Sequence, residues 1–388
     1  MSNVTISDSI KYIGVDDTDL DLFESQYIIP NGVSYNSYVI LDEKVAVMDT
    51  VDARKTVEWF DNLTATLNGR NIDYLVVSHL EPDHSANIKL IAEKYPEAKI
   101  VLSAKAKAML PQFFQIDNLD ERTIVVTEQD ELNLGTHTLK FIMAPMVHWP
   151  EVMVEYEVSE KVLFSADGFG KFGALSADED WACEARRYYF NIVGKYGMAV
   201  QTLLKKAATL DIETICPLHG PILKENLGYY IDKYQTWSSY QPEDDGVFVA
   251  CASIHGNTKD AALSMVDILK EKGAKKVAFA DLTRDDMAEA VEDAFRYDKI
   301  ILAASTYDGG IFTPMDNFLH LLSHKAYQNR KVGLIENGSW APTAAKNMTD
   351  ILSTMKNIDI CENKVTIKSV MNESNVEQMN ILADEILT

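Results

Sequence analysis

The stretch DYLVVSHLEPDH, residues 73–84, combines a strand pattern with a dense group of polar side chains. Its first half is apolar and predicts a buried strand over 73–78. Its second half places four potential metal ligands within six residues: His79, Glu81, Asp83 and His84. Pro82 is expected to keep this half out of regular structure, so that the ligands converge from a loop held by a rigid strand. A solvated polar turn would have a similar composition.

Three later residues extend this cluster, and each follows a predicted strand. They are His148 in PMVHW, Asp167 in FSADG and His219 in PLHGP. Taken singly, each could be a turn residue or a buried core histidine. Together with the first four they supply four imidazoles and three carboxylates without a thiolate, a set that suits iron or manganese as well as zinc.

The chain around these residues alternates between strand and helix patterns. Strands are expected at 35–41, 44–50, 73–78, 99–103, 123–127, 139–144, 152–158 and 161–165, and helices at 53–67, 86–94, 179–207 and 225–236. This mixture indicates sheets covered by helices. The polar stretch SSYQPEDDG, residues 238–246, then reads as a linker and predicts two domains, 1–243 and 244–388.

After the linker the alternation becomes regular. Strands are expected at 247–252, 276–281, 299–304, 331–336 and 364–370, with helices at 259–272, 287–297, 315–323, 344–355 and 376–387. Such βαβ repetition predicts a doubly wound parallel sheet, whose ligands bind at the carboxyl ends of the strands.

The loop SIHGNT, residues 253–258, lies between the first of these strands and its helix. Hydroxyls and the amides of a helix N-terminus can hold a phosphate, although an ordinary helix cap would look similar. Because the loop contains no Lys, a flavin monophosphate fits better than a nucleoside triphosphate. Two later loops offer aromatic rings for stacking, Tyr307 in STYDGG and Trp340 in NGSWA, unless these rings merely pack over their loops.

Composition restricts the possible partners and the compartment. The 388 residues carry a net charge of −23, which disfavours nucleic acid and anionic membranes as partners. The start MSNVTISDSIKYIG has no signal-peptide pattern, and no later stretch reaches 18 apolar residues. Four separated cysteines without a Cys-x-x-Cys pair suit a reducing cytoplasm and exclude a rubredoxin-type knuckle in this chain.

The two halves together resemble a flavodiiron protein, in which a metallo-β-lactamase-like αββα sandwich precedes a flavodoxin-like doubly wound parallel sheet. Glu81 stands where hydrolytic metallo-β-lactamases usually have a second histidine. The resemblance implies two iron ions and FMN as cofactors. It implies one iron on His79, Glu81, His148 and Asp167, and the other on Asp83, His84, Asp167 and His219, with Asp167 bridging.

The resemblance also assigns the flavin contacts. It implies that the FMN phosphate is held by Ser253, His255, Gly256, Asn257 and Thr258. It further implies that two loops flank the ring, formed by Thr306, Tyr307, Asp308, Gly309 and Gly310, and by Asn337, Gly338, Ser339, Trp340 and Ala341.

The activity implied is reduction of O2 to water, of NO to N2O, or of both. Many family members have a histidine near the iron pocket in the N-terminal segment, whereas residues 23–27 contain none, which leaves the preferred substrate open. Electrons would come from a separate rubredoxin-like protein or a reduced soluble cofactor. A head-to-tail homodimer, or a dimer of such dimers, would bring flavin and iron together.

The alternatives are a zinc hydrolase fused to a flavodoxin and an electron carrier with a structural metal domain. The metal content of the protein would distinguish them.

Overall fold

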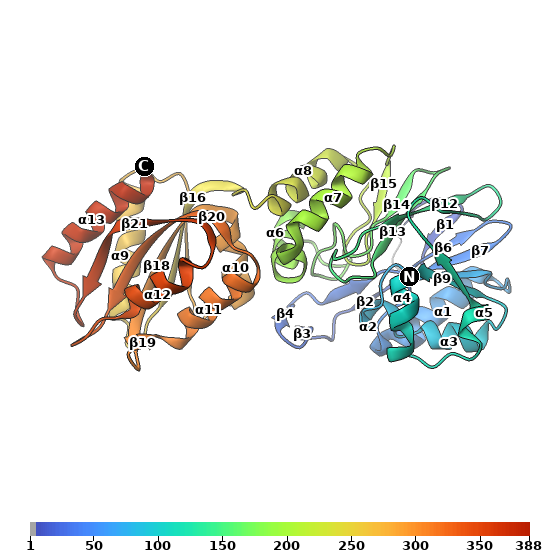
Figure 1. Ribbon diagram of the computed structural model, residues 1–388, viewed down its shortest axis with the longest axis horizontal. Helices are drawn as coiled ribbons and strands as arrows, with labels where there is room; N and C mark the ends of the chain where they lie inside the picture. Colours follow the sequence, from blue (N-terminus) through green and yellow to red (C-terminus); the bar gives the residue numbers. More distant parts are fainter. Residues whose placement is uncertain (1–4) are drawn as a thin grey trace. The chain divides into compact units, whose positions relative to one another are not determined.

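The computed structural model describes residues 5–388, which form two compact units. Unit 1 comprises the described chain up to Tyr188 together with Met198–Gln235, and unit 2 comprises Tyr189–Gly197 and Thr236–Thr388. The boundary expected between residues 243 and 244 stays a prediction. Figure 1 labels the elements of both units.

The first sheet of unit 1 has a mixed order, β1-β6-β7-β8-β9-β10. Its strands are β1 (Ile10–Tyr12), β6 (Tyr38–Leu41), β7 (Val45–Met48), β8 (Tyr74–Val76), β9 (Lys99–Ser103) and β10 (Thr123–Val126). The pairs β1·β6 and β6·β7 are antiparallel, and the pairs from β7 to β10 are parallel. The carboxyl ends of β7 and β8 therefore lie at the same edge, which is where the motif of residues 79–84 begins.

The second sheet of unit 1 packs against the first. Its strands lie in the order β11 (Glu131–Asn133), β12 (Thr138–Met143), β13 (Met153–Glu157), β14 (Val162–Phe164) and β15 (Thr214–Cys216). Neighbouring strands are antiparallel except β14 and β15, which are parallel. Met48 and Val76 of the first sheet share one buried cluster with Phe141, Met153 and Phe164 of the second. This shared core makes the two sheets a sandwich. Two small ribbons, β2 (Val15–Asp17) with β5 (Val33–Tyr35) and β3 (Leu22–Phe23) with β4 (Tyr27–Ile28), complete the unit.

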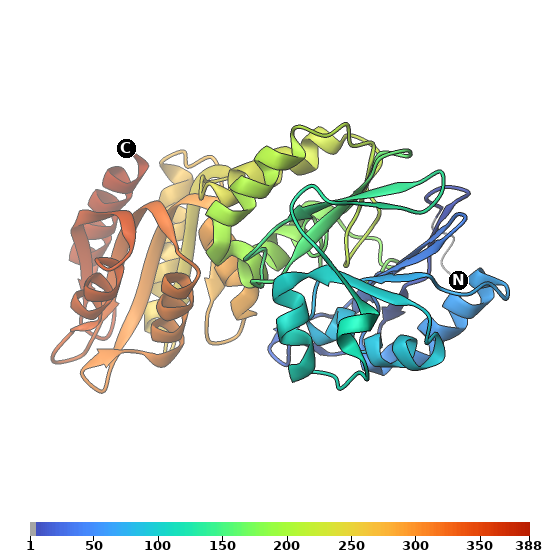
Figure 2. The same ribbon diagram turned by 45° about the vertical axis from the view of Figure 1, so that its right-hand side comes forward.

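Helices cover the outer faces of this sandwich (Figures 1 and 2). They are η1 (Ala53–Lys55), α1 (Thr56–Leu67), α2 (Pro82–Ser85), α3 (Ile88–Lys94), α4 (Ala104–Met109), η2 (Leu110–Gln112), α5 (Leu119–Arg122), α6 (Trp181–Tyr188), α7 (Gly197–Ala207) and α8 (Leu227–Ser238). Trp59 and Leu63 bury the inner face of α1, and Ile88 and Ile91 bury that of α3. The expected αββα layers are confirmed.

The single helix expected over 179–207 is wrong. After α6 the chain forms a π-helical turn (Tyr189–Val193) and a 3-10 turn (Gly194–Tyr196) before α7 begins. A Cβ on Gly197 would lie 2.4 Å from the Ser238 carbonyl oxygen, so only glycine fits there. The Tyr240 hydroxyl donates to the Gly194 carbonyl at 2.9 Å and accepts from the Gly197 amide at 3.2 Å, which satisfies backbone groups freed by the break.

Unit 2 contains one twisted sheet in the order β17-β16-β18-β20-β21, and all of these pairs are parallel. The strands are β16 (Asp244–Ala252), β17 (Val277–Asp281), β18 (Tyr297–Tyr307), β20 (Gln328–Asn337) and β21 (Lys356–Ile367), and β19 (Gly310–Ile311) pairs antiparallel with the end of β18. The helices are α9 (Asn257–Glu271), α10 (Met287–Arg296), α11 (Thr313–His324), α12 (Ala344–Leu352) and α13 (Glu373–Leu387).

This topology confirms the predicted flavodoxin-like sheet. Helices α9 and α13 cover one face of it, and α10, α11 and α12 cover the other (Figures 1 and 2). The strand order reverses at β16, between β17 and β18, so the loops after β16 and β18 diverge and leave a crevice at the carboxyl edge.

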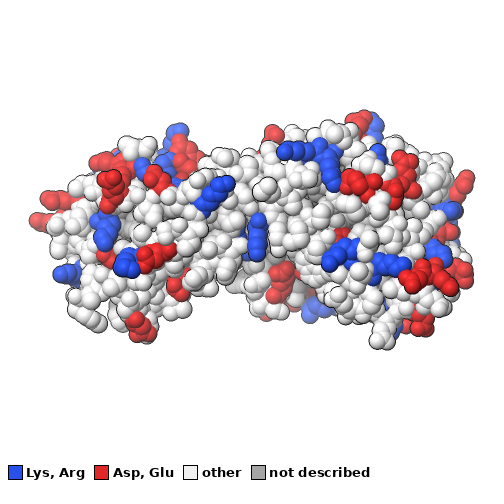
Figure 3. Space-filling model, in the orientation of Figure 1, with Lys and Arg blue, Asp and Glu red and all other residues white. Residues whose placement is uncertain are grey.

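The surface carries charges of both signs. On the face drawn in Figure 3, Lys and Arg are interspersed with Asp and Glu, so on this face the net charge of −23 does not form one continuous acidic patch. Over residues 5–388, every helix is too short or too polar to cross a lipid bilayer.

Candidate metal centre and cofactor cavity

The motif of residues 79–84 leaves the end of β8 and turns directly into α2. Pro82 occupies the first position of this one-turn helix and Glu81 is the N-cap, so the expectation that Pro82 prevents regular structure is wrong. Proline suits this position because its missing N–H has no helical partner there and its φ is already helical. The turn is anchored because the Thr50 amide and hydroxyl donate to the His84 carbonyl at 2.8 and 2.7 Å.

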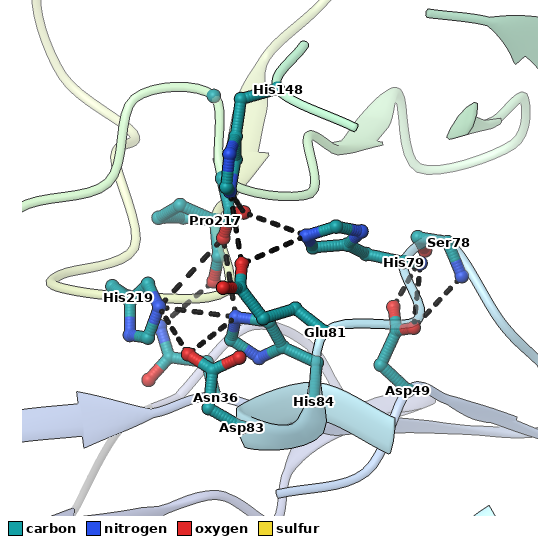
Figure 4. Close-up of polar contacts among 12 residues, drawn as sticks. Asn36, Asp49, Ser78, His79, Glu81, Asp83, His84, His148, Pro217 and His219 are labelled. Atoms are coloured by element: carbon teal, nitrogen blue, oxygen red, sulfur yellow. Dashed lines mark hydrogen bonds and ion pairs between the residues drawn. The ribbon is translucent and has the colours of Figure 1, made fainter. Parts of the chain in front are cut away.

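Four predicted ligands form a first cluster, and Figure 4 labels three of them, His79, Glu81 and His148. One candidate ligand atom from each of His79, Glu81, His148 and Asp167 lies within 4.8 Å of the others. Oε2 of Glu81 is 3.2 Å from Nε2 of His79 and 3.0 Å from Nε2 of His148. His148 comes from the loop between β12 and β13 and Asp167 from the loop after β14, so three loops converge here.

The other three predicted ligands form a second cluster beside it. Oδ2 of Asp83 is 3.3 Å from Nε2 of both His84 and His219, and the two Nε2 atoms are 3.1 Å apart. Asp167 faces both clusters, because Oδ2 lies 3.2 Å from Nε2 of His148 whereas Oδ1 lies 3.2 Å from Nε2 of His84. The structure therefore brings all seven residues together, and places Asp167 between the two groups. Their role as ligands stays a prediction.

The chemistry of these atoms fits a pair of cations. Both carboxylate oxygens of Asp83 and of Asp167 are buried, and neither has a hydrogen-bond partner within residues 5–388. Burial alone lowers the pKa of His148, but the Asp167 and Glu81 carboxylates close to Nε2 outweigh it and raise this pKa to about 9. The same contacts with His148 and His79 overcome the effect of burial on Glu81 and lower its pKa to about 2. Positive charge is therefore favoured between these carboxylates, and a pair of metal cations would supply it.

Residues outside the predicted set hold the ligands in place. Nδ1 of His79 is 2.8 Å from Oε1 of Glu151, and Nδ1 of His219 is 2.7 Å from the Ser34 carbonyl. The Asp49 carboxylate accepts hydrogen bonds from the Ser78 amide and hydroxyl at 2.8 and 2.6 Å, which fixes the chain just before His79 (Figure 4). Sequence reasoning missed these residues because, although Ser78 and Glu151 lie near ligands in the sequence, only the fold brings Glu151 to His79, Ser34 to His219 and Asp49 to Ser78.

The N-terminal segment without a histidine reaches the second cluster. The Phe23 ring packs edge-on against His219, with the ring centres 5.4 Å apart. Burial and then the charge of Glu81 raise the pKa of Glu24, so the β3–β4 hairpin also brings an acid within the electrostatic field of the centre.

Unit 2 contains a cavity of about 700 Å³ at the carboxyl edge of its sheet. Its wall includes all but two of the residues predicted to contact a flavin, namely Ser253, His255, Asn257, Thr258, Thr306, Tyr307, Asp308, Gly309, Asn337, Gly338, Ser339, Trp340 and Ala341. Gly256 and Gly310 are not part of it. Ile254, Ser305, Thr343 and Ser369 also line it and were not predicted, although Ser369 follows β21 and the strand-end rule could have indicated it.

The first loop of this cavity is shaped for an anion. Gly256 has φ 100°, a conformation that favours glycine, and it begins α9 without a side-chain cap. The first amides of α9 therefore remain available to a ligand. Thr258 is buried, and its hydroxyl lies 2.9 Å from that of Ser305, which joins the loops after β16 and β18. A flavin phosphate fits this end of the cavity.

Comparison with known proteins supports the whole architecture. Residues 33–220 match the family model described as ODP family beta lactamase. The uncharacterized protein MJ0732 of Methanocaldococcus jannaschii is 31% identical over 81% of this chain and 80% of its own. The anaerobic nitric oxide reductase flavorubredoxin of Vibrio vulnificus is 26% identical over 87% of this chain and 70% of its own.

Solved structures agree over nearly the full length. Rubredoxin oxygen:oxidoreductase from Desulfovibrio gigas matches with a TM-score of 0.92 and 26% identity, covering 99% of this chain and 97% of that one. A variant of the flavodiiron protein from Thermotoga maritima matches with a TM-score of 0.88 and 26% identity, covering 98% and 96%. The metallo-β-lactamase-like sandwich followed by the flavodoxin-like unit is thus a fold shared along nearly this whole length. The chain belongs to the flavodiiron protein family.

Proposed function

We propose that the protein is an oxidoreductase that reduces O2 to water, NO to N2O, or both, at a non-haem diiron centre supplied with electrons through FMN. The observation that carries this proposal is the placement of Asp167, whose two oxygens face two separate imidazole and carboxylate clusters. A carboxylate in that position can bridge two metal ions.

The ligand atoms divide between the two ions by proximity. One iron would be held by His79, Glu81, His148 and Asp167, and the other by Asp83, His84, Asp167 and His219. Three carboxylates offset most of the charge of two Fe²⁺, and hard oxygen ligands favour iron over the zinc of a hydrolase. A zinc hydrolase is therefore not favoured.

The flavin would occupy the cavity of unit 2. The uncapped α9 N-terminus and the Ser253 and Thr258 side chains would hold its phosphate, and the loops of Tyr307 and Trp340 would flank its ring. When bound, FMN and the two irons supply the electrons of the reduction and the open coordination positions for the gas.

The protein's own residues prepare the metal site. Phe23, Tyr35 and Tyr188 pack their rings around His219, with centres 5.4 to 5.9 Å from the imidazole. This aromatic wall limits the access of water on that side, which strengthens the interactions of the carboxylates with bound cations.

The flavin needs an electron donor, and one relative is named rubredoxin oxygen:oxidoreductase. We propose a rubredoxin-like protein or a reduced soluble cofactor as donor. The four cysteines are free thiols, which suits the reducing cytoplasm proposed as the compartment.

A second copy of the chain would cover the flavin cavity. Two apolar side chains of its wall are exposed, Trp340 at 91% and Tyr307 at 48%, and Val370, next to the wall residue Ser369, is 66% exposed. Exposed apolar groups concentrated around one opening indicate an interaction surface. We propose a head-to-tail homodimer, alone or paired into a tetramer, in which the flavin of one copy approaches the irons of the other.

The test is anaerobic purification followed by metal and flavin analysis and stopped-flow reoxidation. We expect roughly two irons and one FMN per chain, and rapid reoxidation of the reduced protein by O2, by NO, or by both in separate experiments. Protein loaded with zinc in place of iron is the control and should not turn over. Zinc in the protein as purified, with hydrolase activity, would contradict the proposal.

A further inference from the structure

The imidazole of His79 is held from behind by a buried carboxylate. Oε1 of Glu151 lies 2.8 Å from Nδ1 of His79 and accepts the Leu80 amide at 3.0 Å, and both side chains are fully buried. Nδ1 must therefore carry the proton that Oε1 accepts. With the Nδ1 proton held by Glu151, Nε2 is the ring nitrogen that would bind a metal ion, and it faces Glu81 and Asp167 at 3.2 and 3.5 Å.

Glu151 is itself fixed. Its carbonyl accepts the Ser103 hydroxyl at 2.8 Å, and the Trp149 ring stands edge-on to His79 with the centres 5.1 Å apart. Its second oxygen, Oε2, is buried and has no hydrogen-bond partner within the described chain. The carboxylate charge is thus concentrated on the contact with His79, because little else in its surroundings disperses it.

Among residues 5–388, no carboxylate is hydrogen-bonded to the Nδ1 atoms of the other cluster. Nδ1 of His219 donates to the neutral Ser34 carbonyl at 2.7 Å. Nδ1 of His84 is buried and has no hydrogen-bond partner among residues 5–388. A hydrogen-bonded carboxylate therefore stands behind an imidazole of the first cluster, whereas the buried acid Asp49 acts on His84 through charge without a hydrogen bond.

We propose that Glu151 is a positioning residue that fixes the tautomer of His79 and makes the iron on the His79 side the harder of the two to reduce. A carboxylate behind a ligand histidine raises the donor strength of that histidine, and nearby negative charge favours Fe³⁺ over Fe²⁺. An iron held by Asp83, His84 and His219 would then accept the first electron delivered through the flavin, and an iron held on the His79 side would accept the second. This inference rests on the diiron centre proposed above.

The test is a redox titration of Glu151→Gln, with dithionite as reductant and with Mössbauer and EPR spectra recorded at each potential. Glutamine keeps the shape and can still accept from Nδ1 but lacks the charge. We expect both reduction potentials to rise, the second more than the first, so that the mixed-valent EPR signal reaches a lower maximum than in the unmodified protein. In the metal-free protein, affinity for added Fe²⁺ should fall about 10- to 100-fold.

Glu155→Gln is the matched control. Glu155 is also a buried glutamate, four residues further along the chain, but it contacts the Ser78 hydroxyl at 2.9 Å and not a ligand imidazole. Burial raises the pKa of Glu155 well above its usual value, and the substitution leaves the His79–Glu151 contact in place. Both potentials should stay unchanged.

The outcomes separate this inference from the proposed function. If the unmodified protein does not bind two irons, the diiron proposal fails. If Glu151→Gln binds two irons with unchanged potentials, the role of Glu151 is wrong. If Glu151→Gln loses iron altogether, Glu151→Asp decides, because it keeps the charge: recovery of iron and of a mixed-valent state supports the inference, and no recovery overturns it.

Discussion

At the scale of single residues, Glu81 determines the charge of the first cluster. Its Oε2 lies 3.0 to 3.2 Å from the Nε2 atoms of His148 and His79. Glu81→His would replace an anionic oxygen by a neutral nitrogen, which favours zinc over iron. We expect this variant to fold, to contain more zinc than iron, and to lose reductase activity at least about 100-fold, since even residues behind the ligands are worth 10- to 100-fold.

Metal analysis and O2 or NO consumption measure this outcome. Glu93→His on the exposed surface of α3 is the control for the same change of side chain, and it should keep iron and activity. Full activity with iron retained in Glu81→His would contradict the assignment of Glu81 as a ligand.

His137 links its own turn, between β11 and β12, to the turns that contain Asp42 and Glu160. GTHT, residues 135–138, predicts a hairpin turn, and the structure places His137 between β11 and β12. Its Nδ1 lies 2.7 Å from Oδ2 of Asp42 and its Nε2 lies 3.0 Å from Oε1 of Glu160. Burial alone would lower the pKa of His137, but these carboxylates, with the nearby charge of Glu157, raise it. Burial alone would raise the pKa values of Asp42 and Glu160, but hydrogen bonds from His137 lower both.

These opposite shifts predict a stability window. The raised histidine pKa stabilises the fold fully below about pH 6.5, and this contribution is lost as the pH rises through the folded-state value. The lowered pKa values of Asp42 and Glu160 stabilise the fold above about pH 4, and this contribution is lost on acidification. We expect His137→Gln to lower the local opening free energy by about 1.5 to 3 kcal/mol near pH 5.5 and by less at pH 9.

Hydrogen exchange of peptides from β11 and β12 at the two pH values measures this difference, after correction for the intrinsic exchange rate. His320→Gln serves as the comparison because His320 is exposed on α11. An equal loss at both pH values in His137→Gln would show that the charge of His137 does not stabilise the hairpin.

At the scale of elements, the N-terminus of α9 is the part of unit 2 that should recognise the phosphate. Thr258→Asp would place a carboxylate among the amides that face this anion. We expect the variant to be purified with less than about one tenth of the FMN, since 1.4 kcal/mol of repulsion already gives a tenfold loss. The iron content should be unchanged.

Ser264→Asp adds the same charge further along α9, where the Ser264 hydroxyl donates to the Asp260 carbonyl. Flavin absorbance per chain compares the two variants. A full complement of FMN in Thr258→Asp would rule out this helix end as the phosphate site.

Helices and strands whose conformation is determined by residues close to them in the sequence were predictable. The regular alternation after residue 246 predicted the parallel sheet because each βαβ step has its own periodicity. The break after Tyr188 was not predictable, because the groups that stabilise it, Ser238 and Tyr240, lie about 40 residues away. The helical turn at Pro82 was missed although the N1 preference of proline is a local rule. Glu151 could not be found because its partner is 72 residues earlier and only folding brings them together.

At the scale of the whole molecule, the head-to-tail dimer can be tested by complementation. A chain carrying His79→Ala and Glu81→Ala lacks two ligands of one iron but keeps its flavin cavity. A Thr258→Asp chain should keep its irons but not its flavin. Each homodimer should be inactive, whereas a mixed dimer contains one intact flavin opposite one intact diiron centre and should show about half of the unmodified activity.

Coexpression with two affinity tags isolates the mixed dimer, and oxygen or NO consumption is then measured. Metal and flavin analysis confirms that each chain keeps its remaining cofactor. An inactive mixed dimer with both cofactors present would mean that electrons move within one chain.

Unit 2 is built from two separate stretches of the chain, and this limits how the flavodoxin-like unit could be transplanted into another protein. Phe190 stacks on Phe295 with the ring centres 4.3 Å apart, and the Lys325 amine donates to the Asn191 carbonyl at 2.6 Å. Both contacts come from the short stretch Tyr189–Gly197, which the gene encodes inside the sequence of unit 1. A fusion protein that received only residues 244–388 would expose the ring of Phe295. A designer who grafts this module onto another enzyme must therefore also rebuild an aromatic cover for that surface.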